Sequence, residues 1–205
     1  NFHKKLIDFR KKEPEKFSIV YNIIKGNSCL MSILNDKKIL NYASKILETD
    51  KTSIWNGEFQ LRMDTPFDKR NSLDWHQDAS YYRDKTNDGS NGLVMWIALS
   101  KNIKKRHGAI KVCPGSHKEG VLSTKNVVAK SRKFKKSLKT ISRKINKRFI
   151  SRYSPKVIES KRGDLIIMDL RTFHKSGLNK SAYIRFSTLN RVFDTKSKAW
   201  PRDKY

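Results

Sequence analysis

Cysteine is scarce in this chain of 205 residues, which contains only Cys29 and Cys113. Two cysteines cannot build a disulfide framework, and their spacing matches no zinc-binding pattern. No apolar run approaches the roughly 20 residues that a membrane-spanning helix needs. Residues 1–10 lack the apolar segment of a secretory signal. These absences predict a soluble, cytoplasmic protein with no transmembrane segment.

Acidic residues are also few: 19 Asp and Glu stand against 46 Lys and Arg, which gives a formal net charge of +27. Hydrophobic residues make up 37% of the chain, too many for a disordered protein. We find no internal repeat and no low-complexity linker. The length suits one domain with a real core, so we predict a single domain over residues 1–205.

The excess positive charge is concentrated in one segment. Between Gly120 and Ile158 there are 13 Lys or Arg residues and no acidic residue. Apolar residues recur there at steps of three and four, which predicts a basic amphipathic helix inside an insertion over residues 121–156. This stripe consists of Phe134, Leu138, Ile141, Ile145 and Phe149.

Two interpretations of that basic helix remain open. Its lysines can simply be solvated while the apolar stripe packs on the domain, and heavy use of Lys, Asn and Ile throughout the chain favours this reading. Alternatively, it is a docking face for an anionic partner such as nucleic acid, an acidic membrane surface or a charged glycan. No nucleic-acid-binding motif accompanies it.

The order of predicted elements indicates the fold class. Residues 1–54 form a helical part, with helices expected around Phe2–Phe9, around Phe17–Ile24 with Gly26 as a C-cap, and over 28–34 and 37–47. From Trp55 onward, short strands alternate with turn residues. Helices followed by about eight strands predict an α+β domain built on a β-sandwich or barrel. The candidate strands are 57–63, 73–78, 92–99, 109–113, 156–160, 164–169, 172–175 and 182–193.

The residues with metal-binding chemistry fall in two clusters. In Trp75-His76-Gln77-Asp78, the histidine and the carboxylate are two apart, so on a strand they project from the same face. About a hundred residues later, a turn and a buried strand over 163–169 lead to His174. Two histidines and one carboxylate suit a non-haem Fe(II) oxygenase. Arg185, eleven residues beyond His174, has a planar fork that can bind the far carboxylate of a dicarboxylate cosubstrate.

Several motifs in this order resemble one family, over residues 55 to about 193. The chain is similar to the phytanoyl-CoA dioxygenase family of Fe(II)/2-oxoglutarate-dependent oxygenases, which is related to ectoine hydroxylase. The resemblance is carried by Trp75-His76-Gln77-Asp78, Val94-Met95-Trp96-Ile97-Ala98-Leu99, Gly108-Ala109-Ile110, Pro114-Gly115-Ser116-His117, Gly163-Asp164, His174 and Arg185.

The resemblance implies a fold and a set of site residues. The fold would be a double-stranded β-helix, a jelly-roll or cupin-like core over 55–195, with the N-terminal helices packed on one sheet. His76, Asp78 and His174 would be the iron ligands, and Arg185 would bind 2-oxoglutarate. Ser176, Trp96 and Gln60 match positions that contact the cosubstrate or line its pocket.

Gln60 is one choice among three polar residues. Glu58, Gln60 and Arg62 share one face of the strand 57–63, while Phe59, Leu61 and Met63 share the other. The family places a polar cosubstrate contact on this strand. An exposed polar face explains the same alternation.

The function implied is a dioxygenase that uses Fe(II), 2-oxoglutarate and O2, hydroxylates a small molecule, and gives succinate and CO2. Relatives that halogenate replace the ligand carboxylate with a small residue, so Asp78 favours hydroxylation. The basic insertion and the segment 81–84 suggest an anionic or carrier-linked substrate. Two alternatives remain: a nucleic-acid-oxidising enzyme of the same chemistry that grips phosphates with residues 125–150, and a non-catalytic anion-binding module on the same scaffold. The complete set of ligands and Arg185 argue against the second.

Overall fold

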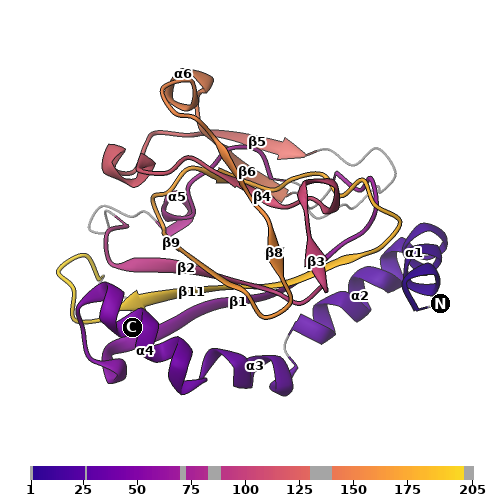
Figure 1. Ribbon diagram of the computed structural model, residues 1–205, viewed down its shortest axis with the longest axis horizontal. Helices are drawn as coiled ribbons and strands as arrows, with labels where there is room; N and C mark the ends of the chain where they lie inside the picture. The colour runs from indigo at the N-terminus through magenta and orange to yellow at the C-terminus, as the bar shows by residue number, and fades with distance from the viewer. Residues whose placement is uncertain (1, 26, 70–72, 83–88, 130–139, 201–205) are drawn as a thin grey trace.

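Four helices open the chain, as predicted. The structure is a computed structural model that describes residues 2–25, 27–69, 73–82, 89–129 and 140–200. The helices are α1 (Phe2–Lys12), α2 (Pro14–Lys25), α3 (Ser28–Leu34) and α4 (Lys37–Leu47) (Figure 1). Asn27 and Asp36 cap α3 and α4 because their side chains accept backbone N–H groups at the helix starts. The expected C-cap Gly26 lies outside the described residues.

Antiparallel strands form the rest of the domain, which confirms the α+β class. The largest sheet has the order β1-β11-β2-β9, and a second sheet has the order β10-β4-β7. Two pairs, β3-β8 and β5-β6, complete the strand list. The bounds are β1 (Ile54–Asp64), β2 (Gly92–Ala98), β3 (Asn102–Ile103), β4 (Ile110–Val112), β5 (Lys125–Ala129), β6 (Thr140–Lys144), β7 (Lys156–Ile158), β8 (Ser160–Lys161), β9 (Leu165–Asp169), β10 (His174–Lys175) and β11 (Arg185–Asp194).

Short helical turns lie between these strands. Two of them are one-turn α-helices, α5 (Ala79–Tyr82) and α6 (Lys147–Ile150). Three are 3₁₀ turns: η1 (Lys51–Ser53), η2 (Lys105–His107) and η3 (Ser116–Glu119). Within the described ranges, no helix is both long and apolar enough to cross a membrane.

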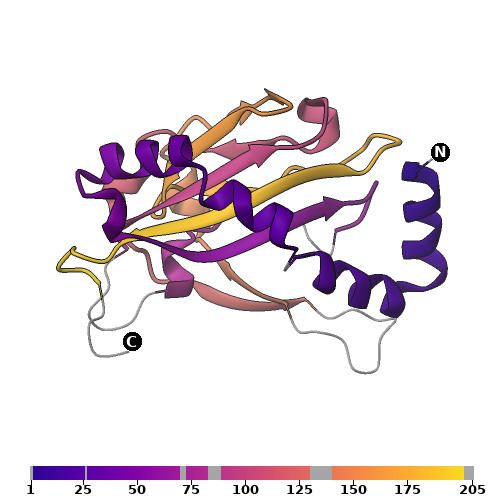
Figure 2. The same ribbon diagram turned by 90° about the horizontal axis from the view of Figure 1, so that it is seen from below.

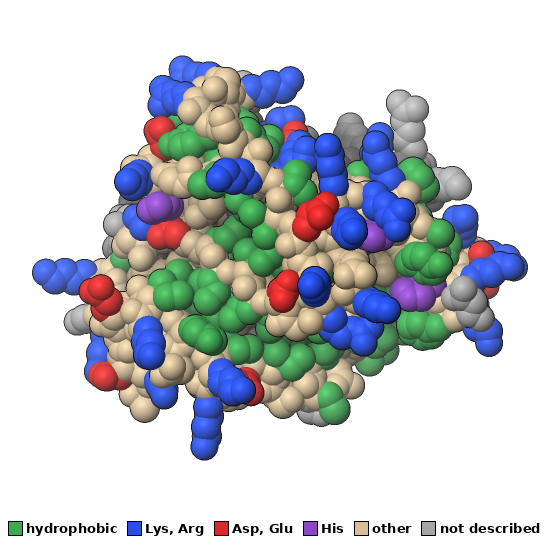
Figure 3. Space-filling view, in the orientation of Figure 1, with side chains coloured by type: hydrophobic (Ala, Val, Ile, Leu, Met, Phe, Trp, Pro, Cys, Tyr) green, Lys and Arg blue, Asp and Glu red, His purple; other side chains and the backbone are tan. Residues whose placement is uncertain are grey.

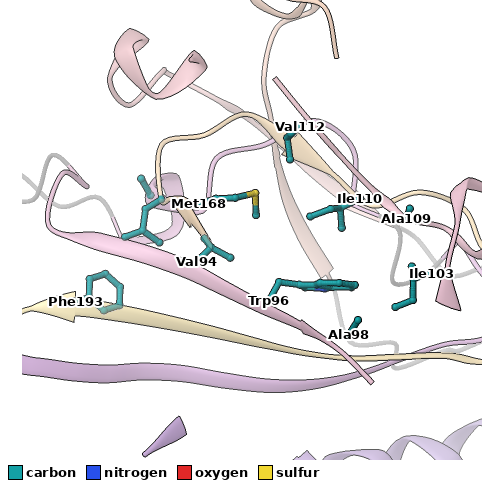
Figure 4. Close-up of a cluster of buried hydrophobic side chains, with 11 residues drawn as sticks. Val94, Trp96, Ala98, Ile103, Ala109, Ile110, Val112, Met168 and Phe193 are labelled. Carbon is teal, nitrogen blue, oxygen red and sulfur yellow. The ribbon is translucent and has the colours of Figure 1, made fainter. Parts of the chain in front are cut away.

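One apolar cluster fills the space between the two larger sheets. Trp96 of β2 lies at its centre, with Ile110 of β4 and Met168 of β9 on either side (Figure 4). Burying such side chains is the main favourable term in folding. The cluster therefore fixes the distance between the sheet that carries β11 and the sheet that carries β10.

The N-terminal helices cover the opposite face of the four-stranded sheet, as expected (Figure 2). Phe17 of α2 is buried against Leu61 and Met63 of β1. Ala43 of α4 is buried against Leu93 and Met95 of β2, within a cluster that also contains Val192. Because strand residues alternate between faces, the other set of residues on these strands points toward the interior between the sheets.

The predicted strand 73–78 is wrong as a strand. Only His76 makes a ladder contact, an isolated antiparallel bridge to His174. The chain turns into α5 directly after Asp78, and the backbone N–H of Ala79 bonds to the carbonyl of Leu170 instead of continuing a ladder. A turn that begins two residues after the bridge leaves no room for a longer strand.

The predicted basic helix is also wrong within the described residues. Over 121–156 the chain forms the β5-β6 hairpin and the single turn α6. β-Branched residues at 127, 128, 140 and 141 favour extended backbone, and pairing between β5 and β6 outweighs the helical spacing. Of the predicted stripe, Phe134 and Leu138 lie outside the described residues. Ile145 and Phe149 instead pack in a cluster with Cys113 and Phe173.

Candidate metal and cosubstrate site

The bridge between His76 and His174 joins two segments that are about a hundred residues apart. Each backbone N–H bonds to the other residue's carbonyl at 3.0 Å. His174 begins β10, where it pairs with Val112 of β4. The sheet therefore places the second histidine, and the bridge places the first beside it.

Gln77 holds the loop that carries the other two candidate ligands. Gln77 stands between His76 and Asp78 in the sequence, and its side chain is fully buried. Its amide nitrogen donates to the carbonyls of Gly120 and Arg171 at 2.6 and 2.7 Å, and its oxygen accepts the N–H of Leu122 at 2.9 Å. These three bonds replace the strand ladder that the sequence predicted and fix the loop on both sides.

The predicted ligands converge on one point. His76, Asp78 and His174 are all buried, and one donor atom from each lies within 4.8 Å of the other two. The Nε2 atoms of His76 and His174 lie 3.4 and 3.6 Å from Oδ1 of Asp78. The two imidazole centroids are 4.2 Å apart.

The hydrogen bonds of the two imidazoles show which nitrogen is free to bind a cation. Nδ1 of His76 contacts the carbonyl of Asp74 at 2.7 Å, and Nδ1 of His174 contacts the carbonyl of Thr172 at 2.9 Å. A carbonyl only accepts hydrogen bonds, so Nδ1 of each ring carries a proton, and Nε2 is the nitrogen left to face a cation. Burial, and then His76, lower the pKa of His174 to about 4, so its imidazole is neutral at pH 7.

Two imidazole nitrogens and a carboxylate oxygen that face one another offer a place for a cation. Oδ1 of Asp78 has no hydrogen-bond partner within the described part of the chain, although Asp78 is fully buried. An unpartnered buried carboxylate oxygen is costly. Two nitrogens and one oxygen are the donor set of a non-haem Fe(II) centre, so these residues fit the metal that the sequence implied.

The other oxygen of Asp78 is taken by an arginine. Nε of Arg191 donates to Oδ2 at 2.7 Å. Burial would raise the pKa of Asp78, but Arg191, His174 and His76 together outweigh it, and the pKa is held well below its ordinary value. Asp78 is therefore an anion at neutral pH, as a metal ligand must be.

Arg185, the predicted cosubstrate residue, is buried and paired with a carboxylate of β1. Its Nε and Nη2 donate to Oδ2 of Asp64 at 3.1 and 2.6 Å, while Nη2 of Arg62 contacts Oδ1 at 3.2 Å. Burial would raise the pKa of Asp64, but the two arginines hold it below its ordinary value. Nη1 of Arg185 has no partner among the described residues, so this end of the guanidinium is available to a ligand carboxylate.

The remaining predicted site residues differ in how they are placed. Gln60 lies opposite Leu189 in the β1-β11 ladder, on the inward face that Arg62 and Arg185 also share. Trp96 is 5% exposed in the cluster between the sheets. Ser176 follows β10, where its backbone N–H bonds to the carbonyl of Leu73.

Three residues near these positions were not predicted from the sequence as site residues. Asp64 continues the alternation of Gln60 and Arg62 on β1, and Arg191 and Ser187 continue that of Arg185 on β11. Ser187 is fully buried, and its hydroxyl has no partner within the described ranges. Period-two spacing along each strand was a usable signal for all three.

A scan against protein families decides the relationship. The sequence model of the family described as phytanoyl-CoA dioxygenase (PhyH) matches residues 13–187, which is most of the chain. The chain belongs to the phytanoyl-CoA dioxygenase family. Dependence on Fe(II), 2-oxoglutarate and O2 is a property of this family. No curated protein matches the chain in sequence.

Solved structures of similar fold agree with this membership. EctD from S. alaskensis, with 2-oxoglutarate and 5-hydroxyectoine, is 18% identical, with a TM-score of 0.62 over 84% of this chain and 55% of its own. EvdO2 from Micromonospora carbonacea var. aurantiaca, complexed with 2-oxoglutarate, is 18% identical, with a TM-score of 0.61 over 83% of this chain and 65% of its own. The epimerase SnoN from nogalamycin biosynthesis is 16% identical, with a TM-score of 0.58 over 83% of this chain and 58% of its own.

These similarities establish the fold. The PhyH-family chain has the cupin-like, double-stranded β-helix architecture that the sequence predicted. It spans between 55% and 65% of the length of those three proteins.

Proposed function

We propose that this PhyH-family chain is an Fe(II)- and 2-oxoglutarate-dependent dioxygenase that hydroxylates a small molecule. One observation carries the proposal: Nε2 of two imidazoles and one carboxylate oxygen converge, and Oδ1 of Asp78 has no hydrogen-bond partner among the described residues. A structural ion pair leaves no such atom unsatisfied. A buried donor set of this kind is typical of a metal centre.

The residues have distinct roles in this proposal. His76, Asp78 and His174 hold the iron. Arg185 receives the distal carboxylate of 2-oxoglutarate through Nη1, its end turned away from Asp64. Ser176, Gln60 and Trp96 complete the cosubstrate pocket: the first two offer polar contacts, and Trp96 provides an apolar wall that excludes water.

The overall reaction consumes one O2 and one 2-oxoglutarate for each substrate. When bound, Fe(II) would supply the redox chemistry: 2-oxoglutarate would lose CO2 and take one oxygen atom of O2 to give succinate, and the other oxygen atom would enter a substrate C–H bond. The protein's contribution is to orient both imidazoles, to keep Asp78 ionised, and to hold the dicarboxylate in one position. Because the carboxylate ligand is present, hydroxylation rather than halogenation is the expected outcome.

We further propose that the substrate carries an anionic group. One cation lies over an aromatic ring next to His76: the guanidinium of Arg143 is 5.4 Å from the centre of the Tyr81 ring. The Tyr81 ring is itself 6.2 Å from the ring of His76. A cation held in this way near a reactive centre suits a carboxylated, phosphorylated or carrier-linked substrate.

The face shown in Figure 3 presents no continuous basic patch among the described residues. On the face shown in Figure 3, Lys and Arg side chains are spread around the molecule, with an apolar area between them. A nucleic-acid-binding face typically gathers its cations in one continuous patch or stripe. Arg143, held over the ring beside His76, suits one small anionic group.

An anaerobic titration tests the main proposal. Fe(II) and 2-oxoglutarate are added to the purified chain while the visible metal-to-ligand charge-transfer band is recorded. The band should appear in the wild type, vanish in His174→Ala and require much more 2-oxoglutarate in Arg185→Ala. His117→Ala is the matched control, because His117 lies on η3 outside the site and its loss should leave the band unchanged. Well-folded wild type without a band would overturn the proposal.

The substrate class is tested separately by 2-oxoglutarate consumption. Candidate metabolites are compared as pairs of an acid and its neutral ester or amide, at low and high salt. We expect the anionic member to stimulate turnover more strongly, and high salt to reduce that difference because it screens the partly exposed cation. Equal stimulation by both members at all salt concentrations would show that the substrate need not be anionic.

A further inference from the structure

We propose that Arg191 is a positioning residue of the metal centre, whose guanidinium holds one oxygen of Asp78 so that only the other oxygen is presented to iron. The inference rests on the proposed assignment of His76, Asp78 and His174 as the iron ligands. It goes beyond that assignment because it names a residue that touches neither metal nor substrate. It also predicts how the carboxylate binds the metal.

The contacts of Asp78 are unequal. Oδ2 accepts Nε of Arg191 at 2.7 Å, whereas Oδ1 has no hydrogen-bond partner within the described chain and faces Nε2 of both histidines. Both residues are buried, with Arg191 6% and Asp78 0% exposed. A charge-assisted hydrogen bond between buried groups is short and strong, so the carboxylate has one defined orientation.

A second buried carboxylate on the same face of the sheet provides the comparison. Oδ2 of Asp64 accepts Arg185, and its Oδ1 accepts Arg62, so both of its oxygens are taken. Asp64 is therefore a fully paired structural anion. Asp78 has one arginine instead of two, and the oxygen left over is the one that lies among the imidazole nitrogens.

Arg191 is itself held on two sides. β11 is an inner strand that pairs with β1 and β2, and Arg191 lies opposite Val94 in the second ladder. Its guanidinium lies over the ring of Tyr82, 5.7 Å from the ring centre. Tyr82 ends α5, the turn that starts directly after Asp78. The segment that supplies the ligand thus also supports the arginine that orients it.

Removing Arg191 should change the metal site in two ways. Oδ2 would lose its donor, so both carboxylate oxygens would be free to chelate one metal ion. The carboxylate would also lose the contact that fixes its orientation, which weakens metal binding. Outer-shell partners of metal ligands typically contribute about 10- to 100-fold to metal affinity.

The test uses Co(II) alone as the probe, added to the purified apoprotein in the absence of cosubstrate. Arg191→Gln should weaken Co(II) binding by about 10- to 100-fold and shift the visible ligand-field absorption of the bound ion. Arg191→Lys keeps the positive charge but not the fixed planar fork, so its affinity for Co(II) should lie between that of the wild type and that of Arg191→Gln. Arg62→Gln is the matched control: it removes a buried arginine from the same sheet face, but one that pairs with Asp64, and it should leave the Co(II) spectrum unchanged.

The outcomes separate this inference from the assignment beneath it. If the wild type binds no Co(II), the ligand assignment fails and Arg191 has nothing to position. If the wild type binds Co(II) and Arg191→Gln binds it with the same affinity and spectrum, the inference alone is overturned. Should Arg191→Gln fail to fold, Arg191→Lys decides: weaker binding than wild type supports the role, and identical binding and spectrum refute it.

Discussion

The two faces of the four-stranded sheet are built from the same strands but differ in the side chains they carry and in their role. The outward face of β1, β2 and β11 presents apolar side chains that pack against the N-terminal helices. The inward face of β1 and β11 carries buried arginines, which pair with Asp64 and with Asp78. Burial of apolar area needs only approximate fit, whereas a buried charge needs a specific partner. Alternate residues of each strand therefore have different roles: one set packs against the helices and stabilises the fold, and the other lies at the candidate site.

Breaking the fully paired carboxylate of the inward face should have the largest effect. Asp64→Ala leaves Arg62 and Arg185 buried without their anion, so we expect the free energy of unfolding to fall by about 3–5 kcal/mol. Urea denaturation measures it. Asp50→Ala is the control, because Asp50 and Lys196 form an exposed ion pair, and its unfolding should be almost unchanged. Equal, small effects of both substitutions would contradict the comparison.

An apolar truncation on the outward face should cost somewhat less. Met95 is 1% exposed in the cluster beneath α4. Met95→Ala removes buried apolar area and leaves a cavity, for a loss of about 2–5 kcal/mol. The folded variant should still bind Co(II) like the wild type, because Met95 points away from the ligands. A large loss of Co(II) affinity in a folded Met95→Ala protein would show that the two faces are coupled.

Acid should act mainly on the inward face. The pKa of Asp64 is lowered in the folded protein, so its stabilising contribution is present above the unfolded value of about 3.9 and is lost as the pH falls through the lower folded value. Asp64→Asn should therefore unfold with a shallower dependence on pH below about pH 4 than the wild type. Acid unfolding of the two proteins is followed by circular dichroism. If their curves are parallel, this explanation is wrong.

The smallest expected effect comes from two neighbouring hydroxyls on β11. The side chains of Ser187 and Thr188 are buried and have no partner among described residues, but they point to opposite faces. Ser187→Ala should weaken 2-oxoglutarate binding about fivefold, as expected for the loss of one hydrogen bond of about 1 kcal/mol. Thr188→Val should leave that affinity unchanged. The same anaerobic titration measures both, and equal affinities would remove Ser187 from the cosubstrate pocket.

Much of the fold was predictable from the residues because it depends on local patterns. The four N-terminal helices follow from helical spacing of apolar residues and from capping side chains such as Asn27 and Asp36. The alternation of Leu61 and Met63 with Gln60 and Arg62 separated the two faces of β1 correctly. The errors arose where pairing partners decide the structure: β5 and β6 pair with each other over residues with helical spacing, and His76 pairs at a single position before the chain turns.

The sequence alone determined the chemical parts of the site: two histidines and an aspartate in motifs of the right order, and an arginine eleven residues later. Only the tertiary structure decided how the carboxylates are used. The spacing of His76 and Asp78 marked Asp78 as a candidate ligand, but nothing in the sequence gave the partners of either carboxylate, and Asp64 was not predicted as a structural anion. Asp64 has Arg62 two residues before it on β1 and Arg185 opposite it on β11, whereas the position of α5 gives Asp78 one arginine, Arg191. Both oxygens of a buried carboxylate need a partner. Arginines occupy both oxygens of Asp64 but only one oxygen of Asp78, so the other oxygen of Asp78 is available for the proposed metal.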